Sequence, residues 1–245
     1  MPFAFHAAAP ALFVRHLQKI VAAAAALSAL GGAAQAQLVL TGIFDGPLTG
    51  GLPKGVEFYA TQDIPDLSLY QVVTYANGSS TATSPVAFSG SATAGEFLYF
   101  AYTTGTTGTD AFASFFGFAP DFSGNAVNVN GDDVVAIRLV SDSSIIDVTG
   151  PIGTDGTGEP WEYLDGWAYR NDGAAASSTY NVADWTFSGI DQLEGGATNA
   201  ATTSPFPIGT YSAVVPEPGS AALIGLSLAA WMGARRRRQP QENAD

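Results

Sequence analysis

The chain of 245 residues contains no cysteine, and its two histidines, His6 and His16, both lie near the N-terminus. The absence of cysteine excludes disulfides, thiolate metal ligands and thiol nucleophiles. Because no histidine follows residue 16, the rest of the chain also lacks the commonest general base and zinc ligand. These absences remove much of the usual chemistry of enzymes before any motif is considered.

Basic side chains are scarce as well, nine against 22 acidic ones, and six of the nine lie in two terminal segments. Between residues 37 and 215 there are three basic side chains, Lys54, Arg138 and Arg170, and 19 acidic ones, a net charge of −16. An anionic body of this kind repels a phosphate backbone. We therefore expect no nucleic-acid partner.

Residues 1–36 have the pattern of a secretory signal peptide, with a weakly basic start and an apolar run over residues 20–30. Eleven helical residues at about 1.5 Å each span about 16 Å, too little for a bilayer core of about 30 Å, so we do not expect a membrane anchor here. The small residues Ala34 and Ala36 form an A-x-A site. This site predicts cleavage between Ala36 and Gln37 and export of the protein.

Residues 212–245 combine three elements in a fixed order. They are Pro216, Glu217 and Pro218, then an apolar run over residues 219–234, then Arg235, Arg236, Arg237 and Arg238. The apolar run predicts a transmembrane helix that the arginines stop, with the arginines on the cytoplasmic side and the body outside. The two prolines favour an extended, accessible segment just before the helix.

This order resembles the PEP-CTERM sorting signal, which is also catalogued as the ice-binding protein C-terminal motif, although nothing in the sequence indicates ice binding. The resemblance implies recognition of Pro216, Glu217 and Pro218 by an exosortase, a membrane peptidase of Gram-negative bacteria that make extracellular polysaccharide. It also implies an inner-membrane precursor with its body in the periplasm, which is then sorted to the cell surface or outside the cell. The alternative is an ordinary membrane anchor that stays attached.

Residues 37–211 predict one all-β domain, an antiparallel β-sandwich. Short β-branched and aromatic runs alternate with clusters of Gly, Asn, Asp, Ser and Thr about every ten residues. The expected strands are 38–44, 56–60, 69–76, 96–103, 134–141, 145–148, 167–170 and 184–187. A short helix is expected over residues 110–117, with Asp110 as its N-cap and Gly117 at its C-terminal end.

Several of these segments also resemble a lamin-tail-type domain. They are LVLTGIFDGPL from Leu38, GVEFYAT from Gly55, the Asp66-Leu67-Ser68 turn, SATAGEFLYFAY from Ser91, NGDDVVA from Asn130 and IIDVTG from Ile145. The resemblance implies an immunoglobulin-like sandwich of a kind found on exported bacterial proteins, and such domains are not themselves catalytic.

Catalytic residues are hard to find in this body. There is no G-x-S-x-G motif and no histidine to activate a serine. Paired carboxylates are the remaining candidates, from Glu57, Glu96, Glu159 and Glu162, but their spacing does not indicate which of them face each other. We expect a protein that is not an enzyme, with a carboxylate-dependent hydrolase as a remote alternative.

Two acidic clusters offer hard oxygen ligands for calcium, the one cofactor that these residues suggest. The first contains Asp132 and Asp133, and the second contains Asp155 and Glu159. Neither cluster has the order of an EF-hand loop or of a calcium β-roll repeat. Solvated turn residues are the simpler interpretation, because Asp favours turns.

Four aromatic residues, Trp161, Tyr163, Trp167 and Tyr169, occupy odd positions and would share one face of an extended chain. Such a face stacks on sugar rings, so a carbohydrate-binding module is an alternative function. Burial in the core, with Arg170 paired to a carboxylate, is the other interpretation. The leading hypothesis is a non-catalytic exported surface or matrix protein associated with exopolysaccharide or biofilm.

Overall fold

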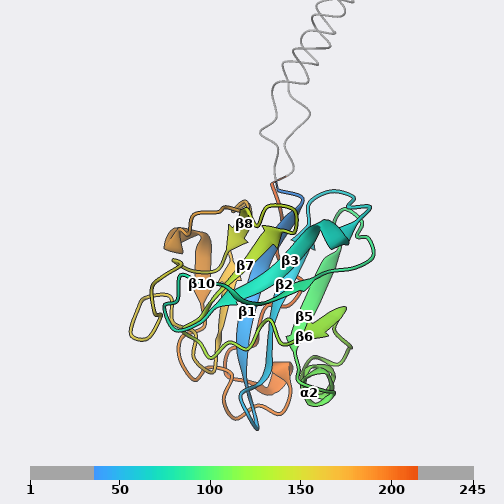
Figure 1. Cartoon of the computed structure of the whole chain (residues 1–245). Helices are drawn as coiled ribbons and strands as arrows, with labels where there is room; N and C mark the ends of the chain where they lie inside the picture. The colour runs from blue at the N-terminus through green and yellow to red at the C-terminus, as the bar shows by residue number, and fades with distance from the viewer. Residues whose placement is uncertain (1–35, 215–245) are drawn as a thin grey trace, which may run out of the picture. The chain divides into compact units, whose positions relative to one another are not determined.

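Two β-sheets pack face to face in the computed structural model, which describes residues 36–214 (Figure 1). The larger sheet has the strand order β10-β9-β1-β2-β5-β6 and the smaller one β4-β3-β7-β8. The strands are β1 (Leu38–Leu48), β2 (Leu52–Ala60), β3 (Tyr70–Tyr75), β4 (Thr83–Ala87), β5 (Phe97–Tyr102), β6 (Phe122–Gly124), β7 (Val134–Leu139), β8 (Ile145–Val148), β9 (Trp167–Arg170) and β10 (Trp185–Phe187). This architecture agrees with the predicted β-sandwich, except that β5 and β6 pair in parallel.

Both faces of both sheets are covered. The central core lies between the sheets, where alternate residues such as Phe58 of β2 and Ile137 of β7 are fully buried. A second core covers the outer face of the six-stranded sheet, with Phe112 of α2 (Thr107–Phe116) and Phe206 packed on it. A third covers the outer face of the four-stranded sheet, where Trp161 packs. This explains why strands such as β5 are apolar on both faces.

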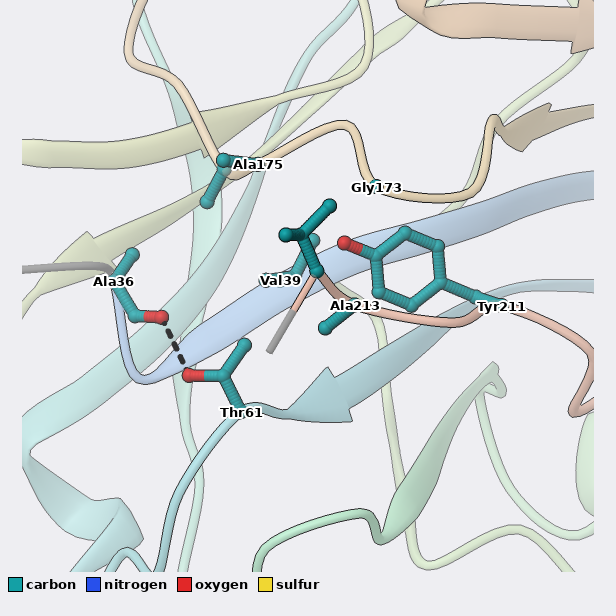
Figure 2. Close-up of a pocket in the computed structure, with 9 residues that line it drawn as sticks. Ala36, Val39, Thr61, Gly173, Ala175, Tyr211 and Ala213 are labelled. Carbon is teal, nitrogen blue, oxygen red and sulfur yellow. Dashed lines mark hydrogen bonds between the residues drawn. The ribbon is translucent and has the colours of Figure 1, made fainter. Parts of the chain in front are cut away.

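The two ends of the described chain lie beside each other at one small cavity (Figure 2). Ala36 and Val214 both line the cavity, together with Thr61 and Tyr211. Its volume is about 10 Å³, room for no more than one water molecule. Thr61 Oγ1 donates a hydrogen bond of 2.9 Å to the Ala36 carbonyl, which holds the first residue against the end of β2. The residues next to both predicted terminal segments therefore meet at one end of the body.

A β-bulge in β1 changes which residues face the core. The register of β1 against β2 shifts between Leu40 and Gly42, so that Thr41 is an extra residue. Leu40 and Ile43 are both fully buried in the central core as a result. On the side of β1 that faces β9, the ladder runs only from Gly42 to Phe44, and the peptide groups of Leu40 need other partners.

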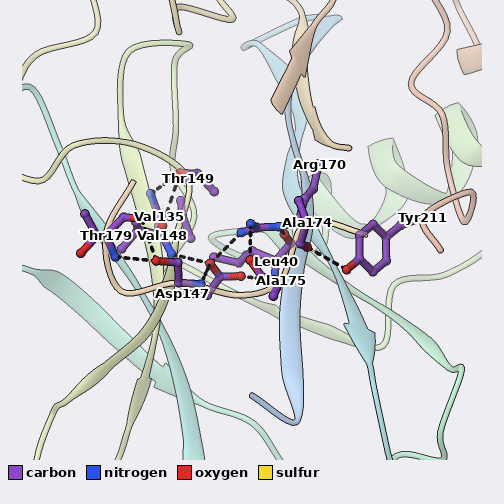
Figure 3. Close-up of polar contacts among 11 residues, drawn as sticks. Leu40, Val135, Asp147, Val148, Thr149, Arg170, Ala174, Ala175, Thr179 and Tyr211 are labelled. Carbon is purple, nitrogen blue, oxygen red and sulfur yellow. Dashed lines mark hydrogen bonds and ion pairs between the residues drawn. The ribbon is translucent and has the colours of Figure 1, made fainter. Parts of the chain in front are cut away.

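A buried ion pair between Asp147 of β8 and Arg170 of β9 supplies these partners (Figure 3). The Arg170 Nη2 and Asp147 Oδ1 atoms are 2.6 Å apart, and the side chains are 2% and 0% exposed. Three backbone N–H groups also donate to the Asp147 carboxylate, from Leu40 (2.9 Å), Val148 (3.0 Å) and Ser177 (3.0 Å). The pair joins the two sheets, because β8 and β9 belong to different sheets.

Each of the three nitrogen atoms of the Arg170 guanidinium donates a hydrogen bond. Its Nε donates to the Leu40 carbonyl at 2.6 Å, and its Nη1 donates to the Ala175 carbonyl at 3.0 Å. Its Cζ atom lies 4.5 Å from the ring centroid of Trp185, a cation–π contact. A charge removed from water needs this degree of coordination to be tolerated in a core.

The expected secondary structure differs from the structure at a few points. All eight expected strands are present, but the sequence reasoning missed β4 and β6. β4 is an exposed edge strand that contains Pro85, and β6 has three residues, so neither has a strand-like pattern. The helix α2 begins at Thr107 rather than after an Asp110 cap, and Asp110 lies in its first turn. Its end at Gly117, with φ of 87°, is as predicted.

Three short 3-10 helices complete the secondary structure of the described residues: η1 (Leu67–Leu69), η2 (Val182–Asp184) and η3 (Asn199–Ala201). Within residues 36–214, no helix is long and apolar enough to cross a membrane. The predicted signal helix, the sorting residues Pro216 to Pro218, the helix predicted over 219–234 and the arginines 235–238 lie outside the described residues.

Asp147→Ala is expected to destabilise the body by about 3–5 kcal/mol, because it leaves the Arg170 charge buried without a counter-ion. The double change of Asp147→Leu with Arg170→Met is expected to cost less than the sum of the two single changes, since it removes both buried charges together. Urea unfolding followed by tryptophan fluorescence measures the free energies of Asp147→Ala, of the two single variants Asp147→Leu and Arg170→Met, and of the double variant. Strictly additive effects would show that the two charges are not coupled.

Candidate functional site

The four aromatic residues considered as a sugar-binding face are buried. Trp161, Tyr163, Trp167 and Tyr169 are 4%, 1%, 7% and 6% exposed. They also lie in three separate cores: Trp161 on the outer face of the four-stranded sheet, Tyr163 between the sheets, and the other two on the outer face of the six-stranded sheet. The interpretation of these residues as an exposed carbohydrate-binding face is therefore wrong. They are core residues, as the alternative interpretation of the sequence predicts.

The polar atoms of three of these rings serve the fold. The Tyr163 hydroxyl donates to the Asp133 carbonyl at 2.9 Å, and Trp167 Nε1 donates to the Ser204 carbonyl at 2.8 Å. The Tyr169 hydroxyl donates to Glu57 at 2.7 Å. Buried Tyr and Trp need such partners, so these contacts have structural roles.

The acids considered as calcium ligands occupy two different environments. Asp132 and Asp133 are buried in the loop before β7, whereas Asp155 and Glu159 are exposed. Asp133 Oδ1 accepts from the Asn77 N–H at 2.8 Å, and burial raises the pKa of this carboxyl. The remaining donors come from nearby loops: Thr157 Oγ1 to Asp132 at 3.1 Å and the Thr157 N–H to Asp155 at 2.9 Å.

Within residues 36–214, no group of three His, Asp or Glu side chains is arranged to hold a metal ion. The structure thus does not bring the four acids together as a ligand set. The side-chain amide of Asn130 faces Asp132 and Asp133 at 2.9 and 2.6 Å and donates to both when its nitrogen points towards them. These carboxylates accept hydrogen bonds from nearby loop donors, which is the usual arrangement of acidic residues in turns.

Among the described residues, no hydrogen bond joins the side chains of the four glutamates considered as catalytic acids, and the one bond between two of them runs from the Glu162 N–H to the Glu159 carbonyl at 3.1 Å. Glu57 is buried in the second core, Glu96 accepts from the Thr93 N–H at 2.8 Å, and Glu162 accepts from the Gly158 N–H at 2.8 Å. Glu159 is exposed. The four side chains thus lie in different environments, and three of them have separate hydrogen-bond donors.

Glu57 instead forms the centre of a network that the sequence reasoning did not find. Its carboxylate is fully buried and accepts hydrogen bonds of 2.7 Å each from Thr41 Oγ1, the Tyr169 hydroxyl and the Gly209 N–H. Burial raises the pKa of Glu57, although these donors act in the opposite direction. Gly209 lies 152 residues along the chain, so no local pattern marks this contact.

The segment that carries Gly209 is fixed across the six-stranded sheet, and we call residues 204–214 the strap. The Tyr169 hydroxyl accepts from the N–H groups of Thr210 and Tyr211, both at 3.0 Å. The Tyr211 hydroxyl donates to the Ala174 carbonyl at 2.8 Å (Figure 3). Ser212 is held twice, by its N–H to Asp172 Oδ1 and by its carbonyl to the Gly173 N–H, both at 2.8 Å. The strap is thus fixed up to Ser212.

The surface of the body carries acidic charge almost without basic charge. Lys54 is 10% exposed and pairs with Asp45 at 3.0 Å, and Arg170 is buried in its own pair. Arg138, the third basic residue between residues 36 and 214, is half-buried. Ten carboxylate side chains in this region are exposed, among them Asp63 and Glu194.

Comparison with known proteins identifies one segment of the chain. Residues 214–238 match the family model of the PEP-CTERM protein-sorting motif. No curated protein and no solved structure matches the chain. The match confirms the predicted sorting motif and implies export and sorting by an exosortase-type enzyme, with a membrane-anchored precursor. The lamin-tail resemblance of the body has no support from these comparisons.

Trp161→Ala and Trp167→Ala are each expected to lower the free energy of unfolding by about 3–5 kcal/mol, because each leaves a large cavity in a packed core. Leu69→Ala is the control, since the Leu69 side chain is 55% exposed. Urea unfolding gives the free energies, and a glycan array gives any change in sugar binding. A tryptophan variant that lost sugar binding at unchanged stability would contradict the assignment to the core.

The stability of the body is expected to fall as the pH rises. The folded-state pKa of Glu57 is raised above its ordinary value of 4.5. Between these two pKa values the folded state therefore binds a proton that the unfolded state releases. Asp45 acts in the same direction, because burial raises its pKa to about 6. The stabilisation from Glu57 is full below pH 4.5 and that from Asp45 below pH 3.8, and each is lost as the pH rises through the folded-state pKa of that group.

Thermal unfolding between pH 4.5 and 8 tests this dependence. Glu57→Gln is expected to lower stability at every pH, because the amide nitrogen cannot accept from the Gly209 N–H, but to reduce the slope against pH. Glu159→Gln on the surface is the matched control. An unchanged slope in Glu57→Gln would show that Glu57 titrates alike in the folded and unfolded chains.

Proposed function

We propose that the chain is a non-catalytic exported protein that is sorted through its C-terminal motif and displayed as an acidic β-sandwich at the cell surface or in the extracellular matrix. The observation that carries this proposal is the match of residues 214–238 to the PEP-CTERM motif. The motif begins two residues after Ser212, the last residue that hydrogen bonds hold to the body. The segment that the sorting peptidase would recognise therefore follows the folded body directly in the sequence.

The non-catalytic part of the proposal is supported by how the acids of the body are used. Glu57, Asp147 and Asp45 are buried and each accepts hydrogen bonds that hold two or more segments together. The described cavity has a volume of about 10 Å³. A cavity of that size does not admit a sugar or an ester. Neither the hydrolase nor the aromatic sugar-binding face has a specific observation in its favour.

The proposed matrix partner is exopolysaccharide, as in a biofilm, and the charge of the surface restricts its chemistry. Ten exposed carboxylates of the described residues, which one half-buried arginine offsets only slightly, repel an acidic polysaccharide unless divalent cations lie between the two. A neutral polysaccharide meets no such repulsion. We also propose that the β-sandwich has the immunoglobulin-like topology that the lamin-tail resemblance implies.

Glu217→Ala is expected to abolish sorting, because it removes the charged residue between the two prolines of the motif. In the native host, the wild-type protein is expected outside the membrane with an intact mass that ends near Pro218. The variant is expected in the membrane fraction with the arginines 235–238 still present. Glu159→Ala, an exposed acid of the body, is the control. A wild-type protein that keeps its arginines would show a permanent membrane anchor instead.

A further inference from the structure

The strap determines how close the sorting motif lies to the folded body. Ser212 is fixed by two hydrogen bonds, and the three residues 213–215 separate it from Pro216. Successive Cα atoms are about 3.8 Å apart, so the Cα atoms of Ser212 and Pro216 are at most about 15 Å apart in any conformation. The peptidase must therefore act very close to the surface of the body while the strap is attached.

Packing extends the attachment beyond Ser212. A Cβ atom on Gly173 would lie 2.8 Å from Cγ2 of Val214, so Val214 rests directly on this glycine. Gly173 has a φ of 78°, which a glycine adopts without strain, and its turn brings Asp172 to the Ser212 N–H. Ala36 lines the same small cavity as Val214, which places the N-terminal segment of the body at this end too.

The folded body is a large obstacle at this distance. A domain of 179 residues has a radius of gyration of about 16 Å, comparable with the maximum reach of the linking residues. A peptidase that binds the Pro-Glu-Pro segment therefore has to work beside the body, because the linking residues set an upper limit on the separation. Detaching residues 211–214 would raise that limit, because Thr210 would then become the last fixed residue.

We propose that the body restrains cleavage of its own sorting motif, and that the peptidase gains full access only when the end of the strap, residues 211–214, detaches. This inference rests on the proposed sorting function. The polar contacts of Ser212 lie at the surface, since Asp172 and Ser212 are both exposed, whereas the Tyr211 ring is 5% exposed and packs in the second core. Release therefore breaks the surface contacts and moves one ring out of the second core, while the two sheets stay folded.

The first test lengthens the linker without breaking a hydrogen bond of the strap or interrupting the matched motif. A six-residue Gly-Ser insertion between Ala213 and Val214 adds about 20 Å of reach and leaves residues 214–238 contiguous. The full chain is expressed in a host that processes it, and pulse-chase labelling gives the initial rate of loss of the precursor. We expect a several-fold faster rate. The same insertion after Gly90, an exposed residue with open space at its Cβ position and a carbonyl that accepts from the Leu67 N–H, is the control and is expected to leave the rate unchanged.

The second test loosens the strap at constant linker length. Tyr211→Phe with Asp172→Ala removes the hydrogen bonds to the Ala174 carbonyl and from the Ser212 N–H. We expect faster processing and an almost unchanged urea midpoint. Asp155→Ala, which removes a similar turn contact to the Thr157 N–H, is the control.

A rate that stays the same or falls after the linker insertion would overturn the inference, whatever the strap variant does. The insertion does not depend on how well the strap variant folds, so this outcome is always decisive. If the wild-type chain and its Glu217→Ala variant are both left unprocessed, the proposed sorting function itself fails. If the wild type is processed and only the insertion has no effect, the inference fails alone.

Discussion

The buried pair of Asp147 and Arg170 is the interaction on which the arrangement of the body depends. Two charges in a core destabilise it unless each is fully coordinated, and here the partners come from several separate parts of the fold. The Leu40 peptide groups, the loop at Ser177 and the ring of Trp185 must all be in place around the pair. The bulge at Thr41 accompanies this arrangement: Leu40 stays paired with β2 but lies beyond the β1–β9 ladder, and its peptide groups meet both charges.

The position of the pair also determines the second polar network. Side chains of a strand alternate between its faces, so an inward Arg170 places its neighbour Tyr169 on the outer face of β9. The Tyr169 hydroxyl then meets Glu57 of β2 and the N–H groups of the strap. The attachment of the C-terminal segment is therefore linked, one residue along the same strand, to the pair that joins the sheets. The body has few basic residues, and the Glu57 carboxylate has no basic partner among its hydrogen-bond donors. Its donors include the hydroxyl groups of Thr41 and Tyr169.

The strands were predictable because their sequence patterns are local. The surroundings of the aromatic residues and of Glu57 were not predictable, because they depend on distant segments. Trp167 and Tyr169 have the same alternation whether their face is open to solvent or covered by a strap whose Phe206 lies far along the chain. The partners of Glu57 are separated from it by up to 152 residues, so no spacing indicates them. The sorting motif was predictable because its prolines, apolar run and arginines are contiguous and each has its own physical meaning.

The distribution of polar groups in the body favours an account in which the terminal segment, rather than the sandwich, directs the protein. The buried carboxylates of Glu57, Asp147 and Asp45 hold segments together, and the exposed ones give the surface a net negative charge. A net charge of one sign opposes close approach to anionic surfaces, but it does not by itself select one partner. Because the strap joins this surface to the motif, the fold influences sorting mainly through the few residues that end at Val214.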